Sequence, residues 1–255
     1  MYEPTLLFSG LLSVLSAGIY CYVGLVLNRR NSSSSASRLA WKLFVVWWYA
    51  LAGATLASAS MNILGAFGIA HLPLFVTLSQ FNLLATCVAL FGLLYYLLYL
   101  FSGDRRWLAP LFVFYIAYYL YLIYFVQASV PVSVSVEPWR TRLIYQEQID
   151  GPLTTILLLL LLFPQIIGSL VYFTLFFRVE TPTQKYRILL VSWSIIIWFL
   201  SAFVANIFGL SQLAWWQVLS RLISLTAALM ILIAYLPPAS IKRRFGVTSI
   251  AEEVP

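Results

Sequence analysis

Residues 213–236 read LAWWQVLSRLISLTAALMILIAYL, and this stretch determines how the rest of the chain is interpreted. It is long enough to cross the hydrocarbon core of a membrane as a helix, because about 20 apolar residues suffice. It also contains Arg221, the only charged residue inside any apolar run of that length in the chain. We therefore expect a membrane-spanning helix with a buried positive charge that must be compensated.

The composition indicates that lipid is the main solvent of this protein. Hydrophobic residues make up 62% of the chain and charged residues only 9%, whereas soluble domains carry about 25% charged residues. The net charge of +7 does not indicate a nucleic-acid partner, because the basic residues lie in short groups that flank the apolar runs. Membrane lipids are the partners that this placement predicts.

Seven apolar runs are long enough to span a membrane. The sequence thus predicts an all-α polytopic membrane protein, with one seven-helix domain over residues 1–240 and a short cytoplasmic tail, 241–255. The predicted helices cover residues 6–27, 43–70, 73–101, 107–130, 152–177, 188–210 and 213–236.

The long loop between the fourth and fifth helices has a β pattern. Residues 132–136 alternate between valine and serine, residues 141–146 could supply a partner strand, and 137–140 contain a proline between them. Such alternation on both sides of a turn predicts a β-hairpin, here over the extracytoplasmic mouth of the bundle. The alternative is an irregular loop on the lipid surface.

Helices two and three resemble helices six and seven in sequence. The sequence NILG at 62–65 matches NIFG at 206–209, and LSQ at 78–80 matches LSR at 219–221. A true duplication would give three helices, a linker helix and three more in the same orientation. The alternative is that apolar helix pairs share such residues by composition.

This 3+1+3 plan resembles the architecture of microbial rhodopsins and of the sugar carriers of the SWEET and PQ-loop type. The resemblance covers most of the chain but departs from both groups at their diagnostic positions. Rhodopsins need a lysine in the seventh helix to bind retinal, and residues 213–236 contain none. Pro164 and Gln165 resemble the dipeptide of PQ-loop carriers, yet the first helix has no matching pair, and a helix kink is the alternative reading.

The sequence lacks the usual residues of a membrane enzyme. All eight Asp and Glu residues lie in loops or near the ends of the chain, and the only histidine is His71. We therefore expect no catalytic site, no metal site and no haem, which would need a pair of histidines. No cofactor is predicted, although the 9 Trp, 16 Tyr and 18 Phe could hold a lipid or pigment.

The candidate ligand site is a group of polar residues around Arg221. With no carboxylate inside the apolar runs, Arg221 must reach water, use neutral acceptors or meet an anionic ligand. The alternative is a neutral hydrogen-bond cluster that only holds helices together. The predicted members, all in the outer halves of their helices, are Arg221, Gln80, Asn62, Asn206, Asn82 and Gln217.

Three functions fit these features, and none is enzymatic. The first is a receptor-like or sensor-like module that binds a small or lipidic ligand in the outer half of the bundle and acts through a separate partner. The second is a small-solute carrier of SWEET-like 3+1+3 architecture. The third is an accessory subunit of a larger membrane complex that binds lipid or pigment.

The loop charges predict the topology of an integral protein of the cell or plasma membrane. Of the 15 Lys and Arg residues, 12 lie in one set of loops and the tail and only Arg140 and Arg142 in the other set. The positive-inside rule therefore places the N-terminus outside and the C-terminus in the cytoplasm. We expect an impermeant maleimide to label a cysteine at Ser135 from outside but not one at Ser34, after replacement of Cys21 and Cys87. Labelling at Ser34 would reverse the topology.

Overall fold

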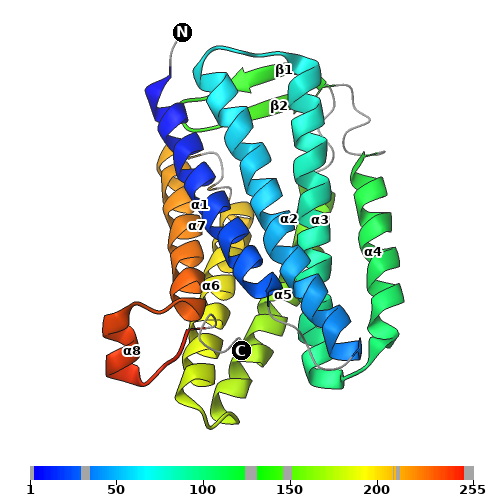
Figure 1. Ribbon diagram of the computed structural model, residues 1–255. Coiled ribbons are helices and arrows are strands. Elements are labelled where there is room, and N and C mark those ends of the chain that lie inside the picture. Colours follow the sequence, from blue (N-terminus) through cyan, green and yellow to red (C-terminus); the bar gives the residue numbers. More distant parts are fainter. Residues whose placement is uncertain are drawn as a thin grey trace.

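Helices α1 to α7 lie side by side with nearly aligned axes, and successive helices run in opposite directions (Figure 1). They are α1 (Pro4–Asn28), α2 (Ser35–Ala66), α3 (Leu72–Ser102), α4 (Leu108–Tyr121), α5 (Gly151–Thr174), α6 (Pro182–Ile207) and α7 (Ala214–Tyr235). Short 3₁₀ helices η1 (Arg105–Trp107) and η3 (Leu175–Phe177) flank α4 and α5, and α8 (Ala239–Phe245) follows α7. This computed structural model describes residues 3–29, 35–123, 131–145, 151–208, 210 and 213–249, with backbone alone at 35–37, 131–132, 145, 151–161, 206 and 214.

Five of the described helices are long and apolar enough to cross a membrane, which agrees with a helical membrane protein. In α5, the described side chains form a shorter apolar stretch, Leu162–Phe177, and α4 is described over 14 residues. The spans are Pro4–Asn28, Arg38–Ala66, Leu72–Ser102, Pro182–Ala205 and Trp215–Tyr235.

The second helix differs from its predicted range of 43–70. It begins at Ser35, because the polar residues before the apolar run continue the helix beyond the membrane-length segment. It ends at Ala66, because Gly68 takes a left-handed φ of 73° and the chain turns there. The backbone N–H of Ile69 donates to the carbonyl oxygen of Leu64 over 3.0 Å and closes this end.

Two other boundaries also depart from the predicted ranges. α6 begins at Pro182 rather than at residue 188, because a proline is well tolerated in the first turn of a helix. The tail predicted for 241–255 is partly helical, since α8 begins at Ala239. The last residues of the range predicted for the fourth helix, 124–130, lie outside the described residues.

The most extensive helix contacts join α1 to α2 and α2 to α3. At the second interface the backbones approach closely, since a Cβ atom on Gly92 would lie 2.6 Å from the carbonyl oxygen of Leu43. Tyr20, Phe44 and Trp48 fill the space between these helices and are at most 2% exposed. Helices α1 to α3 thus form one closely packed unit, which α7 joins through contacts with α1.

The predicted hairpin is present between α4 and α5. Strands β1 (Pro131–Val136) and β2 (Thr141–Tyr145) pair antiparallel, and the N–H of Glu137 donates to the carbonyl oxygen of Arg140 over 2.9 Å to close the turn. The predicted end of the second strand, Gln146, lies outside the described residues. The hairpin crosses the end of the bundle where α1 begins and α2 ends, called the hairpin end below (Figure 1).

Asn62 of α2 fastens the hairpin to the bundle. Its Oδ1 accepts a hydrogen bond from the N–H of Thr141 over 2.9 Å, and its Nδ2 donates to Oγ of Ser9 over 3.5 Å. The side chain of Thr141 packs directly over Gly65, where any Cβ would collide with it. Asn62 therefore joins α1, α2 and β2, and its observed contacts are structural.

Replacing Asn62 with leucine should loosen the hairpin. The N–H of Thr141 would remain buried without its acceptor, which costs about 1–3 kcal/mol. We expect faster hydrogen exchange of the β2 amides, measured by mass spectrometry, together with a lower Tm. Gln80→Leu is the matched control, because Gln80 makes no hydrogen bond with the described part of the chain and should leave β2 unchanged. Equal hydrogen-exchange rates of the β2 amides in the two variants would show that Asn62 does not fasten the hairpin.

Candidate functional site

A cavity of about 330 Å³ lies below the hairpin, between α2, α3, α6 and α7. The residues that α7 contributes include Gln217, Ser220, Arg221 and Ser224, whose spacing of three and four puts them on one face of the helix. The polar face of α7 is therefore directed at the interior of the bundle.

Arg221 lines this cavity, and its Nε is buried without a hydrogen-bond partner. Within the described residues it forms neither an ion pair nor a hydrogen bond. A guanidinium has five donors and keeps its charge at any physiological pH, so it interacts most strongly with an anion. The cavity is the space in which such an anion could reach Arg221.

Arg140 reaches the same cavity from the turn of the hairpin. Its Nε donates to Oε2 of Glu137 over 3.1 Å, while Oε1 of Glu137 accepts from Nε of Arg142 over 2.7 Å. One carboxylate is thus shared by two guanidinium groups. The hairpin keeps an excess positive charge, which adds to that of Arg221.

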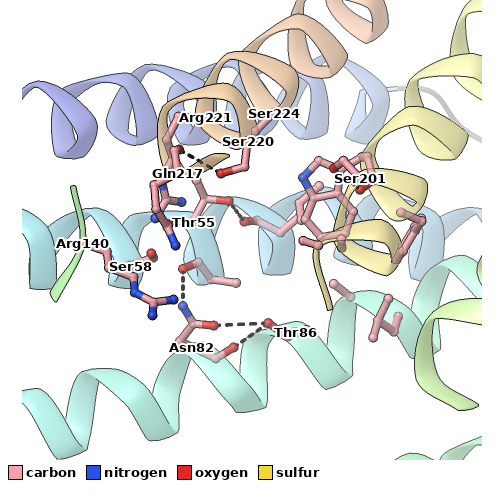
Figure 2. Close-up of a pocket in the computed structure, with 18 of the residues that line it drawn as sticks. Thr55, Ser58, Asn82, Thr86, Arg140, Ser201, Gln217, Ser220, Arg221 and Ser224 are labelled. Atoms are coloured by element: carbon pink, nitrogen blue, oxygen red, sulfur yellow. Dashed lines mark hydrogen bonds between the residues drawn. The ribbon is translucent and has the colours of Figure 1, made fainter. Parts of the chain in front are cut away.

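Asn82 forms part of the cavity wall on α3. Its Nδ2 donates to the carbonyl oxygen of Ala54 in α2 over 3.1 Å, and Oγ1 of Thr86 donates to the carbonyl oxygen of Asn82 over 2.8 Å. Figure 2 shows Arg140 and Asn82 directed toward one another, with Ser58 beside Arg140. Neutral polar groups thus surround the two arginines at the hairpin end of the cavity.

The opposite part of the cavity is apolar and aromatic. Trp47, Leu90, Trp198 and Phe199 line it, and each comes from deeper in the bundle. On α3, Leu90 lies eight residues beyond Asn82, which corresponds to about 12 Å along the helix axis. The cavity therefore combines a cationic, hydrogen-bonding end with an apolar floor, an arrangement that complements a molecule with an acidic head and an apolar body.

The predicted site residues divide into three groups. The structure brings Arg221, Asn82 and Gln217 together around the cavity. Gln80, expected to be a partner of Arg221, is half-buried and outside the cavity lining, and Asn62 binds the hairpin instead. The side chain of Asn206 lies outside the described residues.

Sequence reasoning missed Arg140 as a site residue, because it identified the segment only as a turn. Its position in the cavity depends on where the hairpin folds back, which no local pattern encodes. The one available signal was that Arg140 and Arg142 are the only basic residues in the set of loops opposite the 12 others. Among the side chains that the structure describes, no three His, Cys, Asp or Glu residues are placed to bind a metal ion.

Comparison with protein-family models, curated proteins and solved structures finds no match for this chain. Its function must therefore be inferred from the chemistry of its own cavities.

Arg221→Leu should leave the fold as stable as before or stabilise it. The substitution removes the cost of keeping an unpaired guanidinium in the bundle, and leucine is well suited to a helix. We expect an unchanged or higher Tm, measured by tryptophan fluorescence of the purified protein. Arg178→Leu is the control, because it makes the same substitution of arginine by leucine at an exposed position. A Tm several degrees lower for Arg221→Leu alone would mean that this arginine holds the helices together.

Proposed function

We propose that this protein is a receptor-like or sensor-like module that binds an amphiphilic anion below the hairpin and acts through a separate partner. The proposed ligand has a carboxylate or phosphate head and an apolar body. The observation that carries this proposal is that Arg140 and Arg221 line one cavity, with Glu137 as the one described carboxylate paired to either. Charge-assisted hydrogen bonds from guanidinium to such a head are among the strongest in proteins.

The apolar floor supports the second half of the proposed ligand. Trp47 and Trp198 present large apolar surfaces, and burial of each CH₂ group there contributes about 0.8 kcal/mol. A cavity of about 330 Å³ is at the small end of the range of ligand sites, so the ligand is a small or single-chain molecule.

The same proposal includes seven membrane spans and a topology with the hairpin outside. α4 and α5 supply the two spans beyond the five long apolar helices. The support for the orientation is the distribution of charge, because Arg105, Arg106 and Lys185 belong to the set of 12 basic residues at the end opposite the hairpin. The 3+1+3 repeat, with α4 as the linker helix, is part of this proposal.

Equilibrium dialysis of radiolabelled decanoate against the protein in nanodiscs tests the proposed ligand class. We expect saturable binding above that of empty nanodiscs. Arg221→Leu should weaken it at least tenfold, because a hydrogen bond to a charged group contributes about 1.5–3 kcal/mol. Decanol, which lacks the charge, should bind equally to the unmodified protein and to the Arg221→Leu variant.

Arg142→Leu is the matched control for charge. It removes one positive charge, as Arg221→Leu does. However, Arg142 lies in the hairpin, outside the cavity lining, and contacts Glu137. If Arg142→Leu and Arg221→Leu weaken decanoate binding to the same extent, the effect is a general attraction of anions and the site is wrong. Arg140→Gln serves as a second cavity variant and should also weaken binding.

A carrier is the second candidate, and one observation favours it. A larger cavity, about 530 Å³, lies at the opposite end of the bundle and shares α2, α3, α6 and α7 with the first. Fully buried residues such as Trp48 and Leu93 separate the two ends. A carrier opens one central site to each side of the membrane in turn, and the two cavities lie where the two access routes to such a site would be.

Transport separates the two candidates. Decanesulfonate keeps its charge and crosses lipid slowly, so its exchange between proteoliposomes and the medium reports on a carrier. The receptor-like proposal predicts binding with no protein-dependent exchange. A stable complex co-purified from native membranes would instead favour the accessory subunit.

A further inference from the structure

A small space, called the inner hollow below, lies beyond the apolar floor of the cavity below the hairpin. Its volume is about 20 Å³, and its walls come from α1, α2, α6 and α7. The residues that line both spaces are Trp47, Leu51, Trp198 and Phe199. The residues that line the inner hollow alone are Tyr20, Ser194, Ile195, Ala227 and Ile231. Because the two spaces share walls, they are adjacent.

The inner hollow continues the line of the cavity along α7. Arg221 and Ser224 line the cavity, and Ala227 and Ile231 line the hollow. Spacings of three and four residues put these side chains on one face of the helix. Ala227 lies six residues beyond Arg221, which corresponds to about 9 Å along the helix axis. The two spaces therefore follow one another from the positive charge deeper into the bundle.

The chemistry of the inner hollow suits an apolar group better than water. The hydroxyl group of Tyr20 already donates to the carbonyl oxygen of Ser224 over 3.1 Å. That of Ser194 donates to the carbonyl oxygen of Val191 over 2.9 Å. A buried water molecule needs two to four polar partners, and the other walls are mainly alkyl and aromatic. A space of about 20 Å³ takes a single group of about the size of water, such as the end of an alkyl chain.

The separation between Arg221 and the hollow determines which chains can reach it. Side chains of a helix lean toward its start, so a head bound to Arg221 lies at least about 9 Å from the level of Ala227. Five C–C bonds of about 1.5 Å give hexanoate a contour of less than about 8 Å, which is too short. Eleven such bonds give dodecanoate about 16 Å, which is sufficient.

We propose that the inner hollow receives the terminal methyl group of the ligand and thereby limits the length of its alkyl chain. The inference rests on the proposed binding of an amphiphilic anion by Arg221. It narrows that class to unbranched single-chain acids of medium length. Ala227 and Ile231 are then the residues that determine specificity for chain length, because both form the wall of the hollow.

Equilibrium dialysis of a series of unbranched carboxylates tests the proposal. Radiolabelled hexanoate to tetradecanoate, in steps of two carbons, are dialysed against the protein in nanodiscs, with empty nanodiscs subtracted. We expect the affinity for free ligand to rise about fourfold for each CH₂ group that is buried, until the methyl group fills the hollow. For longer chains the affinity should level off or fall. The chain length at which the rise stops is compared between variants.

Two substitutions in the hollow should move this limit in opposite directions. Ala227→Val adds two methyl groups to the wall, so the limit should shorten and dodecanoate should bind about tenfold more weakly. Ile231→Ala removes part of the wall and should lengthen the limit. Neither should alter the affinity for hexanoate, which ends before the hollow. Ala117→Val is the matched control, because Ala117 is exposed on α4 and lines neither space, and it should leave the whole series unchanged.

Two results would overturn the proposal while leaving the receptor-like function in place. One is the same limiting chain length in the unmodified protein, Ala227→Val and Ile231→Ala. The other is an equal loss of hexanoate and dodecanoate affinity in Ala227→Val, because the substitution would then disturb the site as a whole. If no carboxylate of any length binds in a manner that depends on Arg221, the proposed function itself fails and this inference fails with it.

Discussion

The burial of one permanent charge constrains the hairpin end of this bundle. A guanidinium inside an apolar helix costs several kcal/mol unless something compensates it. Around Arg221 the described chain provides no carboxylate partner, and it leaves a cavity with polar walls instead of close packing. The polar face of α7, the neutral groups on α2 and α3 and the hairpin above them all surround this charge. The polar cavity is thus explained by the charge of Arg221, which cannot be packed closely against apolar side chains.

The hairpin connects two parts of the molecule that differ in packing. Through Thr141 it is fastened to Asn62 in the tightly packed unit of α1 to α3, and through Arg140 it contributes to the cavity against α6 and α7. Because β2 begins immediately after Arg140, the residue that binds Asn62 and the residue that lines the cavity are neighbours in the sequence. Attachment to α2 and contribution to the cavity wall therefore fall to adjacent residues, Thr141 at the start of β2 and Arg140 at the end of the turn.

Local patterns predicted the helices and the hairpin, because apolar length and period-2 alternation directly encode those elements. Neither pattern shows which polar residues meet. Asn62 and Asn82 look equivalent in sequence, yet one binds a strand and the other lines the cavity. The repeat paired Gln80 with Arg221, but a matching position does not fix the face of a helix. The burial of Val247 was also unforeseen, since it depends on the reversal of the chain at Gly246.

The cavity below the hairpin is also a seam between α2 and α3 on one side and α6 and α7 on the other. Contacts across it are few, whereas α1 to α3 hold one another closely. Regions with sparse packing open with a lower free energy than the global unfolding reaction. A molecule that filled the seam would supply contacts that the chain itself does not make, and it would stabilise the folded state by mass action. Occupancy would therefore strengthen the coupling between the two sets of helices, which the contacts of α7 with α1 already connect.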